Sequence, residues 1–452
     1  MAKTQSYNAD SITVLEGLEP VRTRPGMYIG GVGIKALNHL VYEILDNAVD
    51  EHLAGYCTEI WVTLEKDGSC TVKDNGRGLP VDLHSKGMSA ERVIMTTLHA
   101  GGKFDNQVYK TSGGLHGVGS SVVNALSKRM TVDVAREGKV YHDSYSRGIP
   151  TTELHNGLLP VVGKSKETGT TINFLPDDEI FEKTVFKSEW IKSRLHETAY
   201  LNPELTIHFS DMREFAAANV KTEAFVLGDD GQISFGLDNT SKENAEEAVE
   251  KASGGEHVTF HEPDGLRAYI TALNKGQTTV TPLIYFKDTC NDTEVECCFQ
   301  YVDAFEENIH GFCNNIFTQE GGTHITGFKT KYTQLINFYA RQIGILKEKD
   351  NNFTGADTRN GMTCVIAIKY RDPIFEGQTK TKLASADAAS DVASVTGEKL
   401  EHFFDRNIET VKSIIACAEK SAKIRKAEEK AKTNMLSKNK FSFDSNGKLK
   451  VC

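Results

Sequence analysis

The sequence predicts an α+β fold of two or three domains, and three observations lead to that prediction. The chain has 452 residues, of which 39% are hydrophobic, so it can build more than one core. Helical and strand periodicities alternate through the N-terminal half. A second series of strands and helices follows a polar, acidic stretch, which marks a domain boundary.

The N-terminal half is expected to begin with a helix from His39 to Glu51, whose apolar side consists of Leu40, Ile44, Leu45 and Ala48. Strand patterns are found at 59–64, 70–73, 130–134 and 170–174, and further helical patterns at 88–100 and 188–200. The glycine-rich segment 101–119 predicts a long loop of the kind that carries function. The first domain is expected to close near Ser210.

The second half is expected to open with an acidic, solvated insertion at about 216–257, containing one short helix near 242–250. A second α/β domain then has a helix at 265–274 and strands at 283–286, 293–301 and 363–369. The tail from Gly397 to Lys432 predicts one long helix that becomes increasingly basic.

Composition excludes several classes of protein. The formal net charge of -10 argues against a protein that coats nucleic acid with its whole surface. No apolar run approaches the length of a membrane span and no leader-like segment opens the chain, so a cytoplasmic protein without a membrane partner is expected. The nine cysteines include no C-x-x-C pair and are expected to be reduced core thiols.

The first motif is a row of polar residues spaced by four, which places them on one helix face: His39, Glu43, Asn47 and Glu51. The carboxamide oxygen of Asn47 suits Mg²⁺, a cation that takes few protein ligands beside phosphate oxygens. Glu43, one turn earlier, would lie beside that phosphate and accept a proton from an attacking water. A helix that merely lies at the surface could carry the same pattern.

The second motif is the segment Asp74-Asn-Gly76-Arg77-Gly78. Both glycines are expected to permit positive φ and close approach by a ligand, which leaves the Asp74 carboxylate fixed at the end of a strand. Such a carboxylate can accept a hydrogen bond from an exocyclic amine and so distinguish adenine from guanine. Arg77 is within reach of Glu51 for an ion pair. The alternative is an ordinary β-turn.

The third motif, from Gly113 to Gly119, matches neither the Walker loop nor the dinucleotide fingerprint. A glycine-rich loop that leads into a helix near Ser120 still offers clustered N–H donors to phosphates. Lys103 and Lys110 lie in the same loop, and a flexible surface loop is the alternative. In this order, the three motifs predict an ATP pocket.

The three motifs resemble those of the GHKL ATPases, and four further segments resemble type IIA topoisomerases: Arg24–Gly30, Ala100–Asp105, Glu320–His324 and Phe375–Leu383. Within that family, the segment from Gln378 to Lys382 favours the gyrase B branch over topoisomerase IV, where glycine is expected at Thr381. The resemblance implies a Bergerat-type ATPase sandwich at 1–211, with a dimerisation arm at about 1–20. It further implies a transducer domain like ribosomal protein S5 domain 2 at 212–398, and a basic helix at 399–452 leading to a TOPRIM domain that this sequence lacks.

The resemblance also assigns roles to residues. Glu43 would be the general base, His39 would orient it, Lys380 would act with them at the γ-phosphate, and Asn47 would bind Mg²⁺. The nucleotide would be held by Glu51, Asp74, Arg77, Gly78, Pro80, Lys103, Tyr109, Gly114, Leu115, His116, Gly117, Val118, Gly119, Thr170, Gln378, Lys380 and, from a second chain, Tyr7. Arg136 would lie at the pocket mouth, where the family binds coumarin antibiotics.

The implied function is an ATP-driven clamp that closes by homodimerisation on ATP binding. It would work with a gyrase A subunit in an A2B2 holoenzyme, on double-stranded DNA, to drive negative supercoiling, while this chain alone would not cleave or supercoil DNA. The basic tail helix could contact DNA phosphates or be a plain solvated helix. Alternatives for the whole chain are the equivalent topoisomerase IV subunit and a nucleotide-gated dimerisation module with little turnover.

Overall fold

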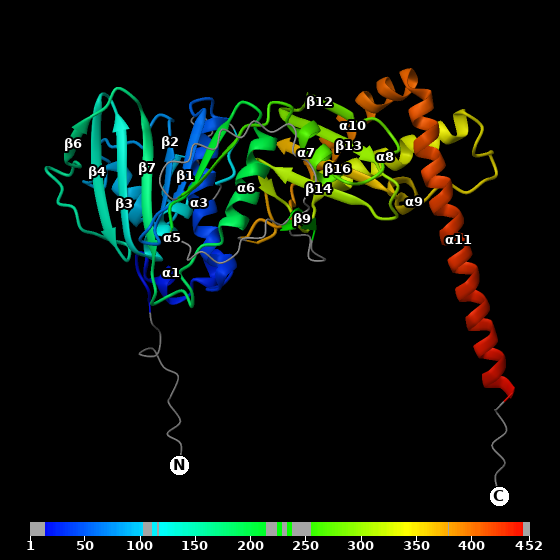
Figure 1. The fold of residues 1–452 in the computed structure, drawn as a ribbon, viewed down its shortest axis with the longest axis horizontal. Coiled ribbons are helices and arrows are strands. Elements are labelled where there is room, and N and C mark those ends of the chain that lie inside the picture. The colour runs from blue at the N-terminus through cyan, green and yellow to red at the C-terminus, as the bar shows by residue number, and fades with distance from the viewer. Residues whose placement is uncertain are drawn as a thin grey trace, which may run out of the picture. The chain divides into compact units, whose positions relative to one another are not determined.

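The computed structural model describes residues 14–102, 111–114, 117–213, 224–227, 233–236, 255–377 and 379–445. Contacts divide the chain into two compact units (Figure 1). The first consists of Met1–Gly265, Asn314–Ile316 and Arg371–Lys380, and the second of Leu266–Cys313, Phe317–Tyr370 and Thr381–Cys452. The first unit therefore extends well beyond the expected boundary at 211, and it includes two short segments from later in the chain.

A nine-stranded sheet forms the first unit, in the order β11-β8-β1-β2-β7-β3-β4-β5, with β6 pairing to β4. Its strands are β1 (Glu59–Leu64), β2 (Cys70–Asp74), β3 (Ser127–Arg136), β4 (Lys139–Ser146), β5 (Ile149–Pro150), β6 (Val161–Lys164), β7 (Gly169–Pro176), β8 (Thr206–Asp211) and β11 (Glu256–Phe260). Among these described strands, β1 and β8 pair in parallel and the other pairs are antiparallel. The four predicted strands are present, whereas β4 was not expected because its sequence is largely polar.

Six helices accompany this sheet in the described part of the unit: α1 (Glu19–Thr23), α2 (Gly26–Ile29), α3 (Ile34–Leu53), α4 (Ala90–Thr96), α5 (Gly119–Ala125) and α6 (Ser188–Leu201). The expected helix at 39–51 lies inside α3, and α6 matches the expectation closely. The predicted helix at 88–100 is shorter than expected, because α4 ends at Thr96.

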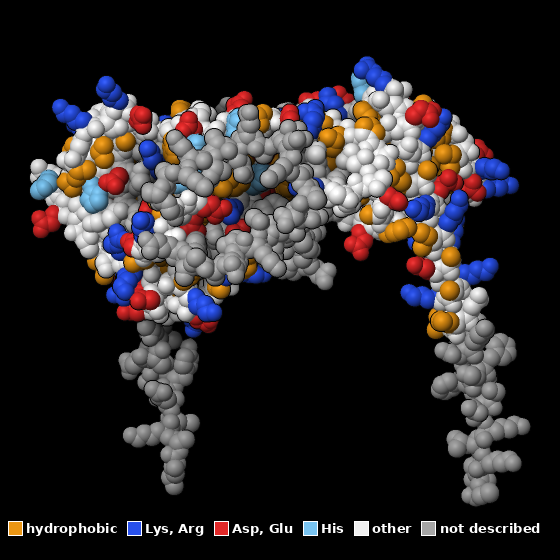
Figure 2. Space-filling model, viewed as in Figure 1, with side chains coloured by type: hydrophobic (Ala, Val, Ile, Leu, Met, Phe, Trp, Pro, Cys, Tyr) orange, Lys and Arg blue, Asp and Glu red, His pale blue; other side chains and the backbone are white. Residues whose placement is uncertain are grey.

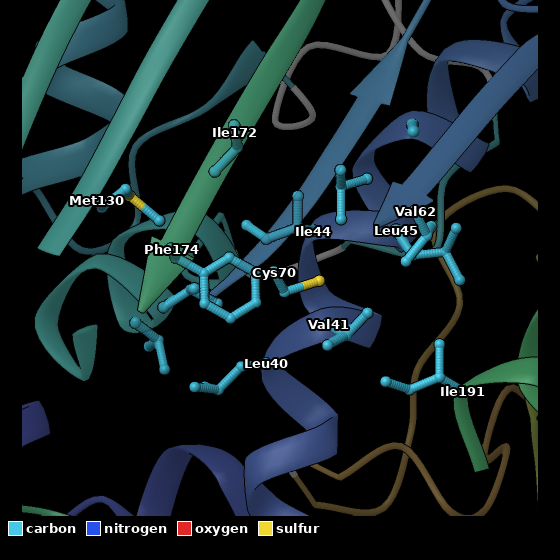
Figure 3. Close-up of a cluster of buried hydrophobic side chains, with 14 of the residues drawn as sticks. Leu40, Val41, Ile44, Leu45, Val62, Cys70, Met130, Ile172, Phe174 and Ile191 are labelled. Atoms are coloured by element: carbon cyan, nitrogen blue, oxygen red, sulfur yellow. The ribbon is translucent and has the colours of Figure 1, made fainter. Parts of the chain in front are cut away.

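The core of the first unit lies where α3, α5 and α6 meet the sheet. Figure 3 shows Leu40, Val41 and Ile44 of α3 near Ile172 and Phe174 of β7. Burial alternates along β1, as expected for a strand with one face toward the helices. Because the apolar side of α3 is fully buried, the rotation of the helix is fixed, and with it the direction of its polar residues.

The expected acidic insertion, at about 216–257, ends where the first sheet resumes. β11 pairs antiparallel with β8, from Glu256 with Asp211 to Phe260 with Ile207, and so returns the chain to the first sheet. Within the insertion, β9 (Ala224–Leu227) and β10 (Ile233–Gly236) form an antiparallel pair. The short helix expected near 242–250 lies outside the described residues.

A five-stranded sheet in the order β12-β13-β16-β14-β15 forms the centre of the second unit. Its strands are β12 (Ile284–Cys290), β13 (Thr293–Tyr301), β14 (Asn308–Cys313), β15 (Ile316–Phe317) and β16 (Met362–Lys369). The helices are α7 (Leu266–Leu273), α8 (Thr323–Gln342), α9 (Gly355–Arg359), α10 (Asp387–Arg406) and α11 (Ile408–Ser445). Together with the first unit, this is the predicted α+β class, with one large sheet in each unit.

The prediction of a single tail helix is wrong, because α10 and α11 are separate helices. Asn407 interrupts them with φ -130° and ψ 51°, values outside the helical region. Its side chain donates to the carbonyl of Phe403 at 2.8 Å and so satisfies one of the carbonyls at the end of α10. The chain then restarts as α11.

Both basic and acidic side chains lie along the described part of α11 (Figure 2). Lys412 pairs with Glu409 at 2.8 Å, and Arg425 pairs with Asp357 at 2.9 Å and with Glu429 at 3.1 Å. Several of the charges expected to form a basic stripe are thus already paired within the chain. Among the residues that the structure describes, no helix has the length and apolar character needed to cross a membrane.

Candidate functional site

A cavity of about 400 Å³ lies in the first unit, between α3, the ends of β2, β3 and β7, and the start of α5. Fourteen residues predicted for the nucleotide site line it: Glu43, Asn47, Glu51, Asp74, Arg77, Gly78, Pro80, Gly114, Gly117, Val118, Gly119, Arg136, Thr170 and Lys380. Another six, Tyr7, Lys103, Tyr109, Leu115, His116 and Gln378, lie outside the described residues. Of the predicted site residues that the structure describes, only His39 does not line the cavity.

His39 and Glu43 are adjacent on α3, with His39 Nε2 3.0 Å from Glu43 Oε1. Burial lowers the pKa of His39, but the hydrogen bond and charge of Glu43 outweigh it, so the net shift is upward. The imidazole therefore holds one carboxylate oxygen of Glu43, while the other lies toward the start of α5. A Cβ on Gly119 would overlap that second oxygen, so glycine at this position lets the carboxylate reach the end of the loop.

Asn47 lies one turn further along α3. Its amide nitrogen donates to the Glu43 carbonyl at 2.9 Å and to Ser120 Oγ at 3.1 Å. These two bonds set the orientation of the carboxamide, and its oxygen is the atom that a cation would contact.

The donor set around Asn47 fits Mg²⁺ held mainly by a nucleotide. Within the described ranges, no group of three or more His, Cys, Asp or Glu side chains could hold a metal ion. An all-protein metal cage is therefore not present there. Magnesium commonly takes one or two protein oxygens and completes its shell with phosphate oxygens and water, and Asn47 can supply such a ligand.

Asp74 closes the opposite end of the cavity. Its side chain accepts a hydrogen bond from Gly76 N at 2.8 Å and lies 3.4 Å from Thr170 N. Asp74 is 8% exposed, and this burial raises its pKa to about 6, although the two N–H groups oppose the shift. The carboxylate is thus fixed in direction and is ionised at neutral pH.

The turn after Asp74 differs in one respect from the prediction. Gly78 has φ +76° as expected, but Gly76 does not have a positive φ. A Cβ on Gly76 would lie 2.9 Å from Asp74 Oδ1 and 3.2 Å from Glu51 Cβ, so space rather than backbone conformation requires glycine there. Thr170 Oγ1 accepts from Leu79 N at 3.2 Å, which ties β7 to the same turn.

The predicted ion pair between Arg77 and Glu51 is confirmed. Arg77 Nη2 lies 2.7 Å from Glu51 Oε1 and Nε lies 3.0 Å from Oε2, a bidentate arrangement. The guanidinium also lies over the Tyr56 ring, 3.8 Å from its centroid. At the same end, Arg136 Nη1 donates to the Gly78 carbonyl at 3.0 Å.

The phosphate-loop residues converge at the other end, where Gly117 has φ +58° and α5 begins at Gly119. Lys380 also lines this end, and its Nζ donates to the Gly113 carbonyl at 2.9 Å. Lys380 was expected to come from the second domain. The contacts instead group it with the first unit, together with Arg371–Thr379.

Sequence reasoning missed two acidic residues of α3. Asp50, 1% exposed, accepts hydrogen bonds from Gly113 N at 2.8 Å and Gly114 N at 3.2 Å. Asp46 lines the cavity and lies 3.4 Å from Arg194 Nη2. Their spacing of three and seven from Glu43 was a usable signal for a shared helix face, but their partners lie far away in the sequence.

Two family models match the chain. The family described as "Histidine kinase-, DNA gyrase B-, and HSP90-like ATPase" matches residues 33–180, and the family described as "DNA gyrase B" matches residues 265–434. The first match contains most of the cavity wall, and the second lies in the strands and helices from α7 to α11.

Named relatives match along almost the whole chain. The DNA gyrase B protein of Mycolicibacterium smegmatis is 44% identical over 429 residues, which cover 95% of this chain and 62% of the relative. The DNA gyrase B protein of Thermotoga maritima is 41% identical over 458 residues, covering 99% of this chain and 65% of the relative. The B subunit of DNA topoisomerase 4 from Staphylococcus aureus is 42% identical over 430 residues, which cover 94% of this chain and 58% of the relative. The chain thus spans somewhat less than two thirds of these relatives.

Two solved structures are similar over nearly their full length. The 43K ATPase domain of Thermus thermophilus gyrase B, in complex with an aminocoumarin, has a TM-score of 0.69 and 36% identity, with 92% of this chain and 97% of that chain covered. The topoisomerase IV ATP-binding domain of Francisella tularensis, with a small-molecule inhibitor, has a TM-score of 0.68 and 30% identity, with 91% of this chain and 98% of that chain covered.

Proposed function

This chain belongs to the DNA gyrase B family, and from that membership we propose that its first-unit cavity binds ATP with Mg²⁺ and hydrolyses it. The observation that carries the proposal is that one cavity has a fixed carboxylate at each of its two ends. Asp74 lies at one end with a backbone-fixed carboxylate, and Glu43 lies at the other, against the glycine that ends the phosphate loop.

Each end of the cavity has a separate task. Asp74 accepts the hydrogen bond of the adenine amine, with Thr170 beside it and Arg77 held in place by Glu51. The loop residues and Lys380 bind the phosphates through N–H groups and an ammonium. Asn47 would hold Mg²⁺ together with phosphate oxygens, and the ion would neutralise charge at the bond that breaks.

Glu43 acts as the general base in this proposal. Its carboxylate takes a proton from the water that attacks the γ-phosphate, and the His39 imidazole, 3.0 Å from the other carboxylate oxygen, keeps it in position. His39 is not among the residues that line the cavity, so in this proposal it acts through Glu43 as a positioning residue.

The proposal for the whole protein follows from its relatives. The chain spans 62% and 65% of the two gyrase B relatives, and we propose that negative supercoiling requires the whole length of such a protein. We propose a chain that dimerises on ATP binding and works with gyrase A and double-stranded DNA in the cytoplasm. Arg136, at the mouth of the cavity, would contact coumarin inhibitors. The gyrase B branch is favoured over topoisomerase IV by the relatives and by the family model that matches residues 265–434.

The variant Glu43→Gln tests the proposal. It keeps the side chain's shape and its contact with His39 but removes the base, so phosphate release should fall at least about 100-fold. Binding of a non-hydrolysable ATP analogue, measured by calorimetry, should stay within about twofold, since the glutamine leaves the adenine end unchanged. Wild-type turnover no higher than that of the variant would favour the alternative, a nucleotide-gated dimerisation module.

A further inference from the structure

Asn314 and Asn315 form the two-residue turn between β14 and β15, and contacts group this turn with the first unit. Their φ values are +50° and +64°. Two consecutive positive φ values are typical of the tightest hairpin turns, where asparagine is favoured over most other residues. Such turns usually lie in solvent, but Asn314 is only 2% exposed.

The buried side chain of Asn314 bonds to the phosphate loop. Its Nδ2 donates to the Ser112 carbonyl at 2.8 Å, directly before the two glycines that open the loop. On the next residue, a Cβ at Gly113 would lie 3.1 Å from the Asn314 carbonyl and 3.3 Å from Ile316. The backbone of Gly113 therefore lies closely against the turn.

Asp50 and Lys380 bond to the two residues that follow Ser112, which are Gly113 and Gly114. The Asp50 carboxylate accepts from the N–H groups of Gly113 and Gly114, and Lys380 donates to the Gly113 carbonyl. Three consecutive residues of the loop are thus hydrogen-bonded by three distant parts of the chain. The backbone of Ser112–Gly114, at the start of the loop, is therefore fixed from three sides.

The turn is itself anchored beside the cavity. The side chains of Asn315 and Asn202 exchange two hydrogen bonds of 3.2 Å. The Asn315 carbonyl accepts from Arg194 Nη2 at 3.0 Å, and the same nitrogen lies 3.4 Å from Asp46, which lines the cavity. Movement of the turn would therefore disturb both the loop and the cavity wall.

We propose that Asn314 is a positioning residue for ATP hydrolysis, which fixes Ser112–Gly114 so that the loop's N–H groups meet the phosphates. This inference rests on the proposed function of the cavity. Its effect belongs at the phosphate end, because the turn contacts the loop and not the Asp74 end. The residue should therefore matter more for ATP turnover than for binding of a nucleotide that lacks the γ-phosphate.

The variant Asn314→Gly tests this directly, because glycine keeps the positive φ of the turn and removes the side chain that donates to the Ser112 carbonyl. Loss of one buried hydrogen bond to the loop should lower kcat/KM for ATP at least about fivefold. The dissociation constant for ADP should change by less than about twofold, because the adenine end is intact. A purely structural role would not separate the two nucleotides in this way.

The matched control is Asn315→Gly, the neighbouring position of the same turn. Its side chain bonds to Asn202 and not to the loop, and the Asn315 carbonyl keeps its bond from Arg194, so kcat/KM for ATP should fall less in this variant than in Asn314→Gly. Equal losses in both variants, or no loss in Asn314→Gly, would overturn the proposal. Equal weakening of ATP and ADP by Asn314→Gly would also overturn it.

Hydrogen exchange provides a readout that does not depend on turnover. The amides of Gly113 and Gly114 should exchange faster in Asn314→Gly than in wild type and in Asn315→Gly, because the Ser112 carbonyl beside them has lost its partner in the turn. Unchanged exchange would contradict the role of Asn314 even if the wild-type protein proved inactive. If the wild-type protein showed no ATP turnover while the amides of Asn314→Gly exchanged faster, the proposed hydrolysis would be wrong. The catalytic part of this inference would then be wrong as well.

Discussion

At the scale of the residue, burial and pairing decide what each carboxylate of the cavity can do. Asp74 is buried and accepts from backbone N–H groups, and its pKa rises to about 6. Glu51, by contrast, is paired with Arg77 in a bidentate arrangement. The two acids stand at the same end of the cavity, and Asp74 is the one whose carboxylate is placed to meet an adenine amine.

Nucleotide affinity should therefore depend on the protonation of Asp74. In the proposed function, the ionised carboxylate would accept a hydrogen bond from the adenine amine, and its protonation as pH falls through about 6 would remove that acceptor. From a pKa of about 6, the ionised fraction falls roughly tenfold between pH 7 and pH 5, and ADP affinity should fall with it. Calorimetry with ADP measures this without involving the hydrolytic end, where His39 also titrates.

The control for this prediction is Asp74→Asn, which keeps an acceptor oxygen but cannot titrate. Its ADP affinity should be nearly constant over the same pH range. A wild-type affinity equally constant between pH 7 and pH 5 would show that Asp74 does not contact the base.

Contacts between side chains were predicted well from the sequence wherever both partners belonged to one motif or to neighbouring motifs. The Glu51–Arg77 pair follows from helix spacing and a short turn, and the structure contains it. The expectation of a positive φ at Gly76 was wrong, because crowding by Asp74 and Glu51 is a property of the packed site. Asp50 was missed for the same reason, since its partners Gly113 and Gly114 lie more than sixty positions on.

At the scale of the element, α11 is held by buried apolar residues of its first half, Val411, Ile414 and Ile415, and by an ion pair further along. Arg425 bonds to Asp357, which is 1% exposed and also completes the capping box of α9 with Thr354. Burial raises the pKa of Asp357, but the bonds from Arg425 and Thr354 outweigh it, and the net pKa lies below the usual value. The pair therefore links α11 to α9.

The variant Arg425→Ala should lower the free energy of unfolding by about 1 kcal/mol, less than a fully buried pair would, since solvent reaches Arg425. The loss should be visible above about pH 4, where Asp357 is ionised in the unfolded chain too, and should shrink as pH falls through its lowered folded pKa. Urea unfolding at several pH values measures both effects.

Lys412→Ala is the matched control on the same helix. Lys412 pairs with Glu409, whose side chain is 82% exposed, so its removal should cost less than about 0.5 kcal/mol. An equal cost for both variants would mean that Arg425 contributes only a surface charge.

Element boundaries were predicted best where the hydrophobic pattern is strong. β1 and β13 have the predicted bounds because alternating or continuous apolar residues end at clear turns. The helix α8 was passed over, although Ile325, Phe328, Tyr332 and Leu335 recur at helical spacing. Its many threonines and aromatic residues have weak helix propensity, and burial of that apolar stripe in the second unit compensates.

At the scale of the whole molecule, Lys380 connects a late segment of the chain to the phosphate end of the cavity. Its Nζ bonds to the Gly113 carbonyl, and its backbone has φ +55°, rare for a residue with a side chain. A γ-phosphate near the loop would offer the ammonium a stronger partner than a neutral carbonyl. The presence of ATP rather than ADP would then be sensed through this segment.

Lys380→Ala should accordingly weaken binding of a non-hydrolysable ATP analogue at least about tenfold and ADP binding by less than about twofold. Dimerisation driven by the analogue, measured by analytical ultracentrifugation, should shift to higher nucleotide concentration by a similar factor. Lys382→Ala, two residues along, provides a lysine control that should remain close to wild type. Equal losses for both nucleotides in Lys380→Ala would remove its role as a γ-phosphate sensor.

The sequence by itself determined the fold class, seven of the sixteen described strands, the three motifs and the polar face of α3, because periodicity and spacing are local properties of the chain. Only the tertiary structure decided which segments belong together. It placed Lys380 and Asn314 with the first unit, carried β11 back to β8, and divided the expected tail helix at Asn407. These features depend on hydrogen bonds and packing between residues that are far apart in the chain. A local sequence pattern does not show which distant residues come into contact.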